Sequence, residues 1–460
     1  MRKVFILAAL AMGLYLSSCT EKIDAPFYSE NAVTNVELRA ILEAEGVTFN
    51  EAGCIYVDDA AKAITSLDLS GKKIVDLAGL EALSNLAELN LSDNGFGPVF
   101  DFSIVPAQVT SIDLTKNDIY EVANLVNIDE QTAKVTLIHD FAKMALPESV
   151  KFDCYELPQY SKNDKEVDMK MGEVAYTTLR EVPDANTLFL LKQLYPSMFD
   201  GDKIDVSRRL VNPKEKTANL EIHKDYLPEP AEGKENEIKS VEGVQYIVLN
   251  KGFEGGTVNI SATSECELAY LKIGSSVTDL SIARVSTPNL DLSGAENLAS
   301  IFFTNNHGVT VADLSASKQF GQREYELENG SMKNPSKIQI KYCDNLKSII
   351  LPEKARIVNT IQVGELKNLE SFDMSKLNAV AILQLVTMPK CKIGYPVYQF
   401  DLKPEGYLQW SFGCEKDIFD KPETKAMLDK YHDGLKRDVT MWFGMPAHFR
   451  GYDWKSHYNK

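Results

Sequence analysis

The sequence predicts a repeat solenoid, α/β to mainly β, whose coils stack short strands into a parallel sheet. We expect two arrays of coils, separated by a non-repeat module. Three copies of one motif follow each other at nearly constant spacing in the first third of the chain, and apolar pairs recur in the second half, the last five of them 11 or 12 residues apart. A stack of coils is expected because one coil alone cannot bury its apolar face.

The first residues have the character of an export signal. A basic start precedes an apolar run from Val4 to Leu16, which is too short to span a bilayer stably. The run ends in LSSC, which resembles the lipobox of bacterial lipoproteins. The resemblance implies cleavage before Cys19 and acylation of that cysteine with several chains, which hold a membrane where one chain does not. The alternative is a secreted protein with a chance cysteine. The predicted signal peptide and tether are residues 1–18 and 19–35.

Composition excludes some functions. The chain has 460 residues and a net charge of −17, and an acidic chain lacks the basic footprint that nucleic acid requires. Beyond Cys19, six cysteines are scattered without a CxxC pair, so no zinc site is predicted, and each is either a buried thiol or half of a disulfide. Glu21 and Asp24 partly resemble the acidic stretch that sends some Bacteroidetes lipoproteins outward. We therefore expect an outer-membrane lipoprotein exposed at the cell surface.

Residues 36–63 are predicted to cap the first array, because its first coil would otherwise expose core. The segment from Val36 to Glu45 has the pattern of an amphipathic helix. The following lead-in resembles one that carries a calcium loop in some Bacteroidetes relatives. The carboxylates of such a loop are replaced here by Thr48, Asn50 and Ala52, so no metal is expected.

The predicted first array covers residues 64–152. ITSLDLSGKKI starts at Ile64, LAELNLSDNGF at Leu86 and VTSIDLTKNDI at Val109, 22 and 23 residues apart. All three resemble the leucine-rich repeat LxxLxLxxNxL, except that the first has Lys72 in place of Asn. A weaker fourth copy is expected from Thr132, with two apolar residues in strand positions.

The repeated asparagine has a physical explanation. After each strand the backbone turns, and its buried N–H and C=O groups need partners. An amide side chain supplies both donors and an acceptor. Asn94 and Asn117 are therefore predicted to form a ladder between adjacent coils.

The middle of the chain, residues 153–250, loses the pattern and is interpreted as a non-repeat module or insertion. Apolar pairs then return in the predicted second array, residues 251–400, where their spacing favours a strand on both sides of each coil. LKSIILP and LESFDMS resemble coils of BspA-like adhesins. Asn306 and Cys343 occupy the ladder position, whereas later coils have Leu366 and Leu377 there. Residues 401–460 are predicted to be a C-terminal cap.

No motif points to catalysis. No His pair has metal-ligand spacing, and no nucleophile elbow or phosphate loop occurs, so neither a cofactor nor a metal is expected. The repeat does predict an outward face. Its candidate binding residues form two columns, Asp68, Asn90 and Asp113 in one and Ser66, Glu88 and Ser111 in the other. Thr136 is expected to continue the first. No aromatic lies in these columns, which argues against sugar stacking there. A solvated polar face remains the alternative.

Three functions stay open. The first is a non-enzymatic, lipid-anchored cell-envelope protein that uses repeat faces to bind a protein, host or matrix ligand, and we favour it. The second is an accessory glycan-binding surface lipoprotein. The third is a hydrolase with its site in the unassigned middle. The chain as a whole resembles the leucine-rich-repeat surface lipoproteins of Bacteroidetes.

Overall fold

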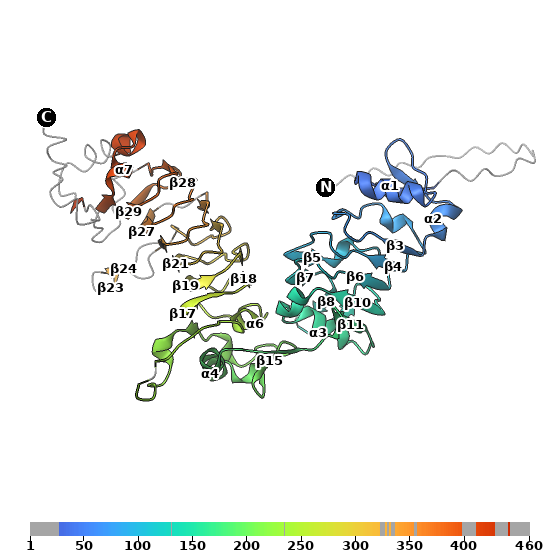
Figure 1. The fold of residues 1–460 in the computed structure, drawn as a ribbon, viewed down its shortest axis with the longest axis horizontal. Helices are drawn as coiled ribbons and strands as arrows, with labels where there is room; N and C mark the ends of the chain where they lie inside the picture. Colours follow the sequence, from blue (N-terminus) through green and yellow to red (C-terminus); the bar gives the residue numbers. More distant parts are fainter. Residues whose placement is uncertain are drawn as a thin grey trace, which may run out of the picture.

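A computed structural model shows two arrays of coils that form the arms of a V (Figure 1). The cap helix α1 (Val36–Ala44) lies at the free end of one arm, and α7 (Lys416–Phe419) at the free end of the other. The structure describes residues 27–129, 131–233, 235–322, 327–328, 331–332, 336–353, 357–397, 411–427 and 440–441. The predicted signal peptide, Cys19 and most of the predicted C-terminal cap lie outside these residues.

The predicted cap helix is present. The side chain of Asn35 accepts a hydrogen bond from Leu38 N at 3.0 Å and so begins α1, whose buried Leu38 and Leu42 pack on the first coils. Two short antiparallel strands, β1 (Tyr28–Ala32) and β2 (Cys54–Tyr56), and the helix α2 (Asp59–Ala63) complete this end. The apolar end of the array is therefore covered.

The first sheet has six strands in the order β12-β11-β10-β6-β4-β3, and all its pairs except β11–β12 are parallel. Its strands are β3 (Ser66–Asp68), β4 (Glu88–Asn90), β6 (Ser111–Asp113), β10 (Lys143–Leu146), β11 (Asp168–Met171) and β12 (Val174–Ala175). The sheet therefore extends beyond residue 152, the predicted end of this array. On the opposite side of the coils lie β5 (Val99–Asp101), β7 (Glu121–Ala123) and the 3₁₀ turns η1 (Leu80–Ala82) and η2 (Phe102–Ile104).

The predicted fourth copy at Thr132 is wrong. The segment forms an antiparallel hairpin of β8 (Val126–Asp129) and β9 (Lys134–Leu137), outside the first sheet. The coil resumes with β10, where Met144 is buried in register with Ile112. Two apolar residues spaced by two fit any half-buried strand, so the pattern alone could not separate a hairpin insertion from a coil.

The predicted asparagine ladder is present. The Oδ1 atom of Asn117 accepts hydrogen bonds from the backbone N–H groups of Asn94, Gly95 and Phe96 at 3.0, 3.0 and 3.1 Å. Its amide nitrogen donates to the carbonyls of Leu91 and Leu114 at 3.0 and 2.8 Å. One coil earlier, Asn94 repeats the pattern: it accepts from Ile74 N and donates to Leu69 O. Both side chains are buried.

The base of the V is built from the middle of the chain. Its helices are η3 (Glu148–Phe152), α3 (Glu156–Ser161), α4 (Ala185–Leu194), η4 (Pro196–Met198), α5 (Pro213–Lys216), η5 (Lys224–Tyr226) and α6 (Val244–Val248). Three short strands pair there as β13-β15-β14, namely β13 (Leu179–Arg180), β14 (Phe199–Asp200) and β15 (Lys203–Asp205). Strand β16 (Leu220–Ile222) already belongs to the second array. The repeat architecture therefore enters the predicted non-repeat module from both ends.

The second array has strands on both sides of each coil, as predicted. Parallel pairing builds one nine-stranded sheet, called here the second sheet: β16, β17 (Thr257–Glu267), β19 (Asp279–Ser286), β21 (Ser300–Thr304), β25 (Lys337–Lys341), β27 (Ile357–Gly364), β29 (Ala379–Val386), β31 (Ser411–Cys414) and β32 (Thr440–Met441). The opposite side has β18 (Tyr270–Lys272), β20 (Asn289–Asp291), β22 (Val311–Asp313), β26 (Ser348–Ile350), β28 (Ser371–Asp373) and β30 (Lys392–Gly394). The predicted bulge after Lys318 contains the hairpin of β23 (Leu327–Glu328) and β24 (Ser331–Met332).

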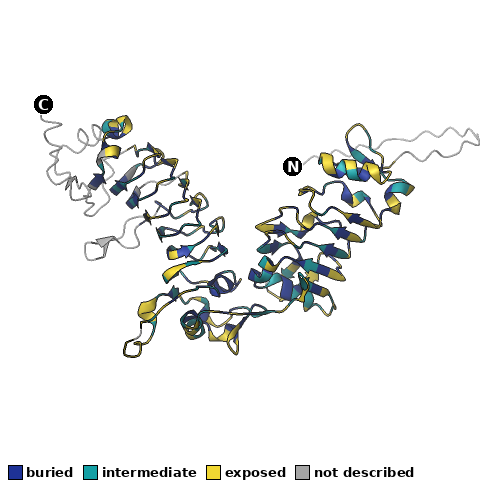
Figure 2. Ribbon diagram, in the orientation of Figure 1, coloured by how far each residue is buried: buried dark blue, intermediate teal, exposed yellow. Residues whose placement is uncertain are grey.

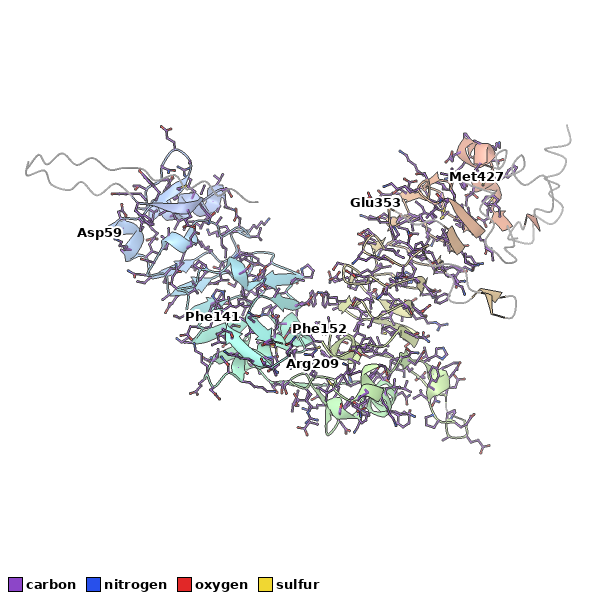
Figure 3. All side chains as sticks on the ribbon, turned by 180° about the vertical axis from the view of Figure 1, so that it is seen from behind. Asp59, Phe141, Phe152, Arg209, Glu353 and Met427 are labelled. Atoms are coloured by element: carbon purple, nitrogen blue, oxygen red, sulfur yellow. The ribbon has the colours of Figure 1, made fainter. Side chains whose placement is uncertain are left out.

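Each arm has its own apolar core, seen as buried strands along its axis (Figure 2). The two cores meet at the base through stacked aromatic rings. Tyr120 of the first array stacks on Tyr270 at 5.2 Å and on Phe152 at 5.7 Å, and Phe152 in turn stacks on Tyr246 at 5.9 Å between ring centroids. Phe152 lies between the two arms (Figure 3). Such offset stacks stabilise beyond the area they bury.

Candidate functional site

A shallow hollow runs across the outer face of the first sheet. Residues from five neighbouring strands line it, and they include all six predicted binding residues: Ser66, Asp68, Glu88, Asn90, Ser111 and Asp113. Strand register places Asp68 beside Asn90 and Asn90 beside Asp113, with Ser66, Glu88 and Ser111 aligned in the same way. The two columns predicted from the repeat therefore exist, although their binding role stays a prediction.

The column of Asp68, Asn90 and Asp113 has a structural task. Each side-chain Oδ1 accepts a hydrogen bond from the backbone N–H two residues later, at 3.0, 3.0 and 2.8 Å. This bond closes the turn that follows the strand. The bond from Ser70 N also lowers the pKa of the Asp68 carboxyl, because it favours the charged form.

The same bond recurs in the other arm. Asp291, Asp313 and Asp373 follow strands on the opposite side of the second array and accept from Ser293, Ser315 and Ser375 at 2.8, 2.9 and 2.8 Å. An Asp or Asn two residues before Ser or Thr is therefore part of the coil itself. A binding role is not needed to explain why these residues recur.

The second column differs. Within the described residues, the structure records no hydrogen bond or ion pair for the side chains of Ser66, Glu88 and Ser111, nor for Lys143, which continues the column on β10. Asp168 comes next on β11, 3.6 Å from the Nζ of Lys170. These are the side chains of the hollow that lack an architectural function.

Charge changes sign along the hollow. The carboxylates of Asp68, Glu88 and Asp113 lie on the strands nearer the cap. The strands nearer the base have Lys143 and Lys170, and Asp168 there is paired with Lys170. The repeat pattern alone missed both lysines, because β10 and β11 do not match it. Ala145 rather than Thr136 continues the first column, since Ala145 is in register with Asp113 and Thr136 belongs to the hairpin.

Polar contacts also join the two arms at the base. Glu121 on β7 accepts hydrogen bonds from the hydroxyl of Tyr270 at 2.9 Å and from Lys272 Nζ at 2.7 Å, both on β18. These two strands lie on the sides of the arms that face each other (Figure 1). Burial, followed by the charge of Glu121, raises the pKa of Tyr270, so its hydroxyl keeps the proton that it donates.

A buried carboxyl lies close to this contact. The pKa of Asp153 is raised to about 7, chiefly by burial and to a smaller extent by the charges of Glu156 and Glu121, against the lowering effect of a hydrogen bond from Leu157 N and of Lys251. Glu156 forms an ion pair with Lys251 at 3.3 Å between Oε1 and Nζ. Charged groups of both arrays therefore meet at one junction.

Neither a metal site nor a membrane-spanning helix is found among the described residues. Within the described ranges, no group of three or more His, Cys, Asp or Glu side chains has an arrangement suited to a metal ion. The six cysteines after Cys19 are all free thiols. No helix in the part of the chain that the structure describes has both the length and the apolar character that crossing a bilayer requires.

Comparisons add little to this geometry. Neither a protein-family description nor a curated protein matches the sequence. One similar solved structure is an internalin (inlF) from Listeria monocytogenes, with 14% identity and a TM-score of 0.21; the match covers 78% of this chain and 91% of that chain. Another is the functional domain of InlJ from the same species, which includes a cysteine ladder, with 12% identity and a TM-score of 0.25; the match covers 80% of this chain and 78% of that chain. Because both TM-scores are low, the fold assignment rests on the strand pairings above.

Proposed function

We propose that this chain is a non-enzymatic, lipid-anchored cell-envelope protein that binds a protein or host ligand across the outer face of the first sheet. The column of Ser66, Glu88, Ser111 and Lys143 is the observation that carries the proposal, since these aligned side chains have no recorded function within the coils. Solenoids commonly bind partners along such repeated faces.

The charges of the hollow indicate the kind of partner. A partner surface with basic groups opposite Glu88 and acidic groups opposite Lys143 would be complementary to the hollow. Complementary charges determine register and exclude wrong partners more than they raise affinity. A protein surface provides both signs within this span, and the lack of an aromatic in the columns argues against a sugar at this face.

Binding assays with charge-swapped variants test this proposal. Residues 20–460 are immobilised and exposed to purified fibronectin, laminin, collagen and fibrinogen and to fixed epithelial cells. We expect saturable binding that Glu88→Lys with Lys143→Glu weakens by about tenfold or more, since 1.4 kcal/mol corresponds to a factor of ten.

The second array supplies a matched control. Glu370→Lys with Lys347→Glu makes the same charge change in two coils joined by the bond from Glu370 N to Lys347 O. This double variant should bind like the parent protein. Equal loss in both double variants, or no binding to any of these surfaces, would contradict the proposed face.

Anchoring at the outer surface is part of the proposal. The LSSC motif supports acylation at Cys19, and the coils that resemble BspA-like adhesins of Bacteroidetes support exposure to the exterior. In cells that process lipoproteins, the parent chain should enter the detergent phase of Triton X-114 and be removed by protease from intact cells. Cys19→Ala should stay in the aqueous phase, and a parent chain that also stays there contradicts the anchor.

A further inference from the structure

The second array has a hollow of its own at the corner where the strands of the second sheet end. Six residues line it: Asn305, His307, Tyr342, Asp344, Glu365 and Lys367. They come from three successive coils, two from each, and no task in the proposed function falls to them. Tyr342 is the only aromatic among them besides His307, and 51% of its surface is exposed.

The backbone fixes these corner residues. Asn305, Tyr342 and Glu365 all have positive φ, at 52, 55 and 55°, and each donates its N–H to a carbonyl of the next coil: Lys341 O at 3.2 Å, Gly364 O at 3.3 Å and Val386 O at 3.1 Å. The neighbouring residues Asn306, Cys343 and Leu366 are buried. Parallel strands are about 4.8 Å apart, so an amide, a phenol ring and a carboxylate form a row at that spacing.

Tyrosine at this corner has no structural explanation. A positive φ is unfavourable for a bulky residue, and Asn tolerates it better. The other corners of the sheet hold Arg284, Asn305, Glu365 and Thr387, so the coil does not require an aromatic. Within the described residues, the structure records no hydrogen bond for the hydroxyl of Tyr342 and no ring contact for its side chain. The ring is a rigid, exposed surface with a polar end.

The charged side chains of the hollow already contact neighbouring side chains, and Glu365 keeps its negative charge because its partner Thr387 is neutral. Asp344 is 3.7 Å from the Nζ of Lys367, and the Nε2 atom of His307 is 3.4 Å from a carboxylate oxygen of Glu265. Glu365 accepts a hydrogen bond from the hydroxyl of Thr387 at 3.1 Å. An anion would meet the carboxylates of Asp344 and Glu365, and a cation would compete with Lys367 for Asp344. A neutral ligand with many hydroxyls needs only the free donor and acceptor positions that amides and carboxylates keep.

We infer that this hollow on the second array is a binding site for a neutral saccharide, with a sugar ring on the face of Tyr342 and its hydroxyls bonded to Asn305 and Glu365. The hollow is not enclosed and spans three coils, which suits an internal stretch of a chain better than a small buried ligand. This site is separate from the first sheet, so it stands or fails independently of the proposed protein partner.

Affinity electrophoresis tests the inference. Residues 20–460 are run in native gels that contain mannan, xyloglucan, amylopectin or mixed-linkage β-glucan, with polysaccharide-free and heparin gels beside them. We expect retardation in at least one neutral gel, a dissociation constant about tenfold weaker for Tyr342→Ala, and most of the affinity kept by Tyr342→Phe.

Controls separate the site from the fold. Tyr226→Ala removes another exposed tyrosine, on η5, and should migrate like the parent chain. Tyr342→Asn, which suits the positive φ, serves if Tyr342→Ala lowers the melting temperature. If the parent chain migrates in every neutral polysaccharide gel as it does in the polysaccharide-free gel, the inference is overturned. It is also overturned if Tyr342→Ala and Tyr342→Asn are retarded as strongly as the parent chain. Retardation in the heparin gel alone would also overturn it, because the chain would then bind an anionic and not a neutral saccharide.

Discussion

The two arrays close their coils by different means. In the first array β3, β4 and β6 have three residues each, and after β4 the N–H groups of Asn94, Gly95 and Phe96 all donate to the Oδ1 atom of Asn117. In the second array β27 and β29 have eight residues each and pair as far as Gly364 and Val386. Beyond that pair, the N–H groups of Glu365 and Leu366 donate to Val386 and Thr387.

The difference explains where the asparagine ladder stops. A side-chain ladder is needed where the strand ends before the turn, because the backbone alone cannot pair its buried groups there. In the second array Asn306 still accepts hydrogen bonds from Thr287 N and Val309 N at 3.0 and 3.2 Å, whereas the later coils, in which β27 and β29 extend the pairing to the turn, have an apolar residue at the ladder position. Cys343 and Leu366 are buried at that position without any amide.

Replacing Asn117 should therefore have the largest effect. Asn117→Leu leaves the N–H groups of Asn94 and Phe96 buried without their acceptor, at about 1–3 kcal/mol for each, and also removes the acceptor of the partly buried Gly95 N–H. We expect the free energy of unfolding of the first array to fall by about 2 kcal/mol or more. Urea denaturation with hydrogen-exchange mass spectrometry would measure the loss and locate it.

The control is the ladder position of the other array. Cys343→Ala removes only a buried thiol, whose hydrogen bond goes to Lys341 O at 3.4 Å, so about 1 kcal/mol of stability should be lost. Equal losses in the two variants would mean that the asparagine ladder has no special role in the first array.

A smaller effect is expected from Asp153, at the junction of the two arrays. Its pKa is about 7 in the folded chain and ordinarily 3.8, so the folded chain holds a proton that the unfolded chain has released. Stability is therefore complete below about pH 4 and falls as the pH rises toward about 7. Asp153→Asn should reduce this fall by on the order of 2 kcal/mol.

Urea titrations at pH 5 and pH 8 measure this loss of stability in the parent chain and in Asp153→Asn. Asp205→Asn is a suitable control, because the pKa of the hydrogen-bonded Asp205 carboxyl is lowered in the fold. Its contribution to the stability of the fold is therefore lost in the opposite direction, as the pH falls. Parallel pH profiles for Asp153→Asn and the parent chain would show that Asp153 is ionised in the fold.

The features that could be predicted from the sequence are those in which a residue type has a single structural role. The Asn94 and Asn117 ladder, the cap helix and the two-sided coils of the second array were all predictable, because each follows from a local pattern. The β8–β9 hairpin was missed because Val135 and Leu137 alternate like any strand. Strands β10 and β11 were missed because neither has the repeat's spacing, and with them the lysines of the candidate site.

The junction could not be predicted at all. Glu121 is 149 residues from Tyr270 and 151 residues from Lys272 in the sequence, and no motif marks any of them. Similarly, the turn bonds of Asp68, Asn90 and Asp113 depend on backbone geometry that the sequence does not show. The sequence therefore predicted an outward column of polar residues but not which of them close turns and which are free to bind a partner.

The contact between the arms should contribute about 1 kcal/mol or less to stability, because the side chains of Lys272 and Glu121 remain 31% and 25% exposed. Its effect on shape should be larger. Glu121→Ala removes both bonds to β18, so the angle between the arms should vary more. Small-angle X-ray scattering should show a broader distance distribution than for the parent chain. Glu88→Ala is the control, and identical curves for both variants would mean that the aromatic stack alone fixes the arms.

The smallest effect separates architecture from binding within one coil. Asn90→Ala removes the turn bond to Ser92 N and should lower the free energy of unfolding by about 1 kcal/mol. Affinity for a partner of the first sheet should stay nearly unchanged, whereas Glu88→Ala should weaken binding at unchanged stability. Thermal denaturation and the binding assay on the same preparations test both. If Asn90→Ala weakens binding more than Glu88→Ala does, the turn residues also contact the partner, and the hollow works as a whole.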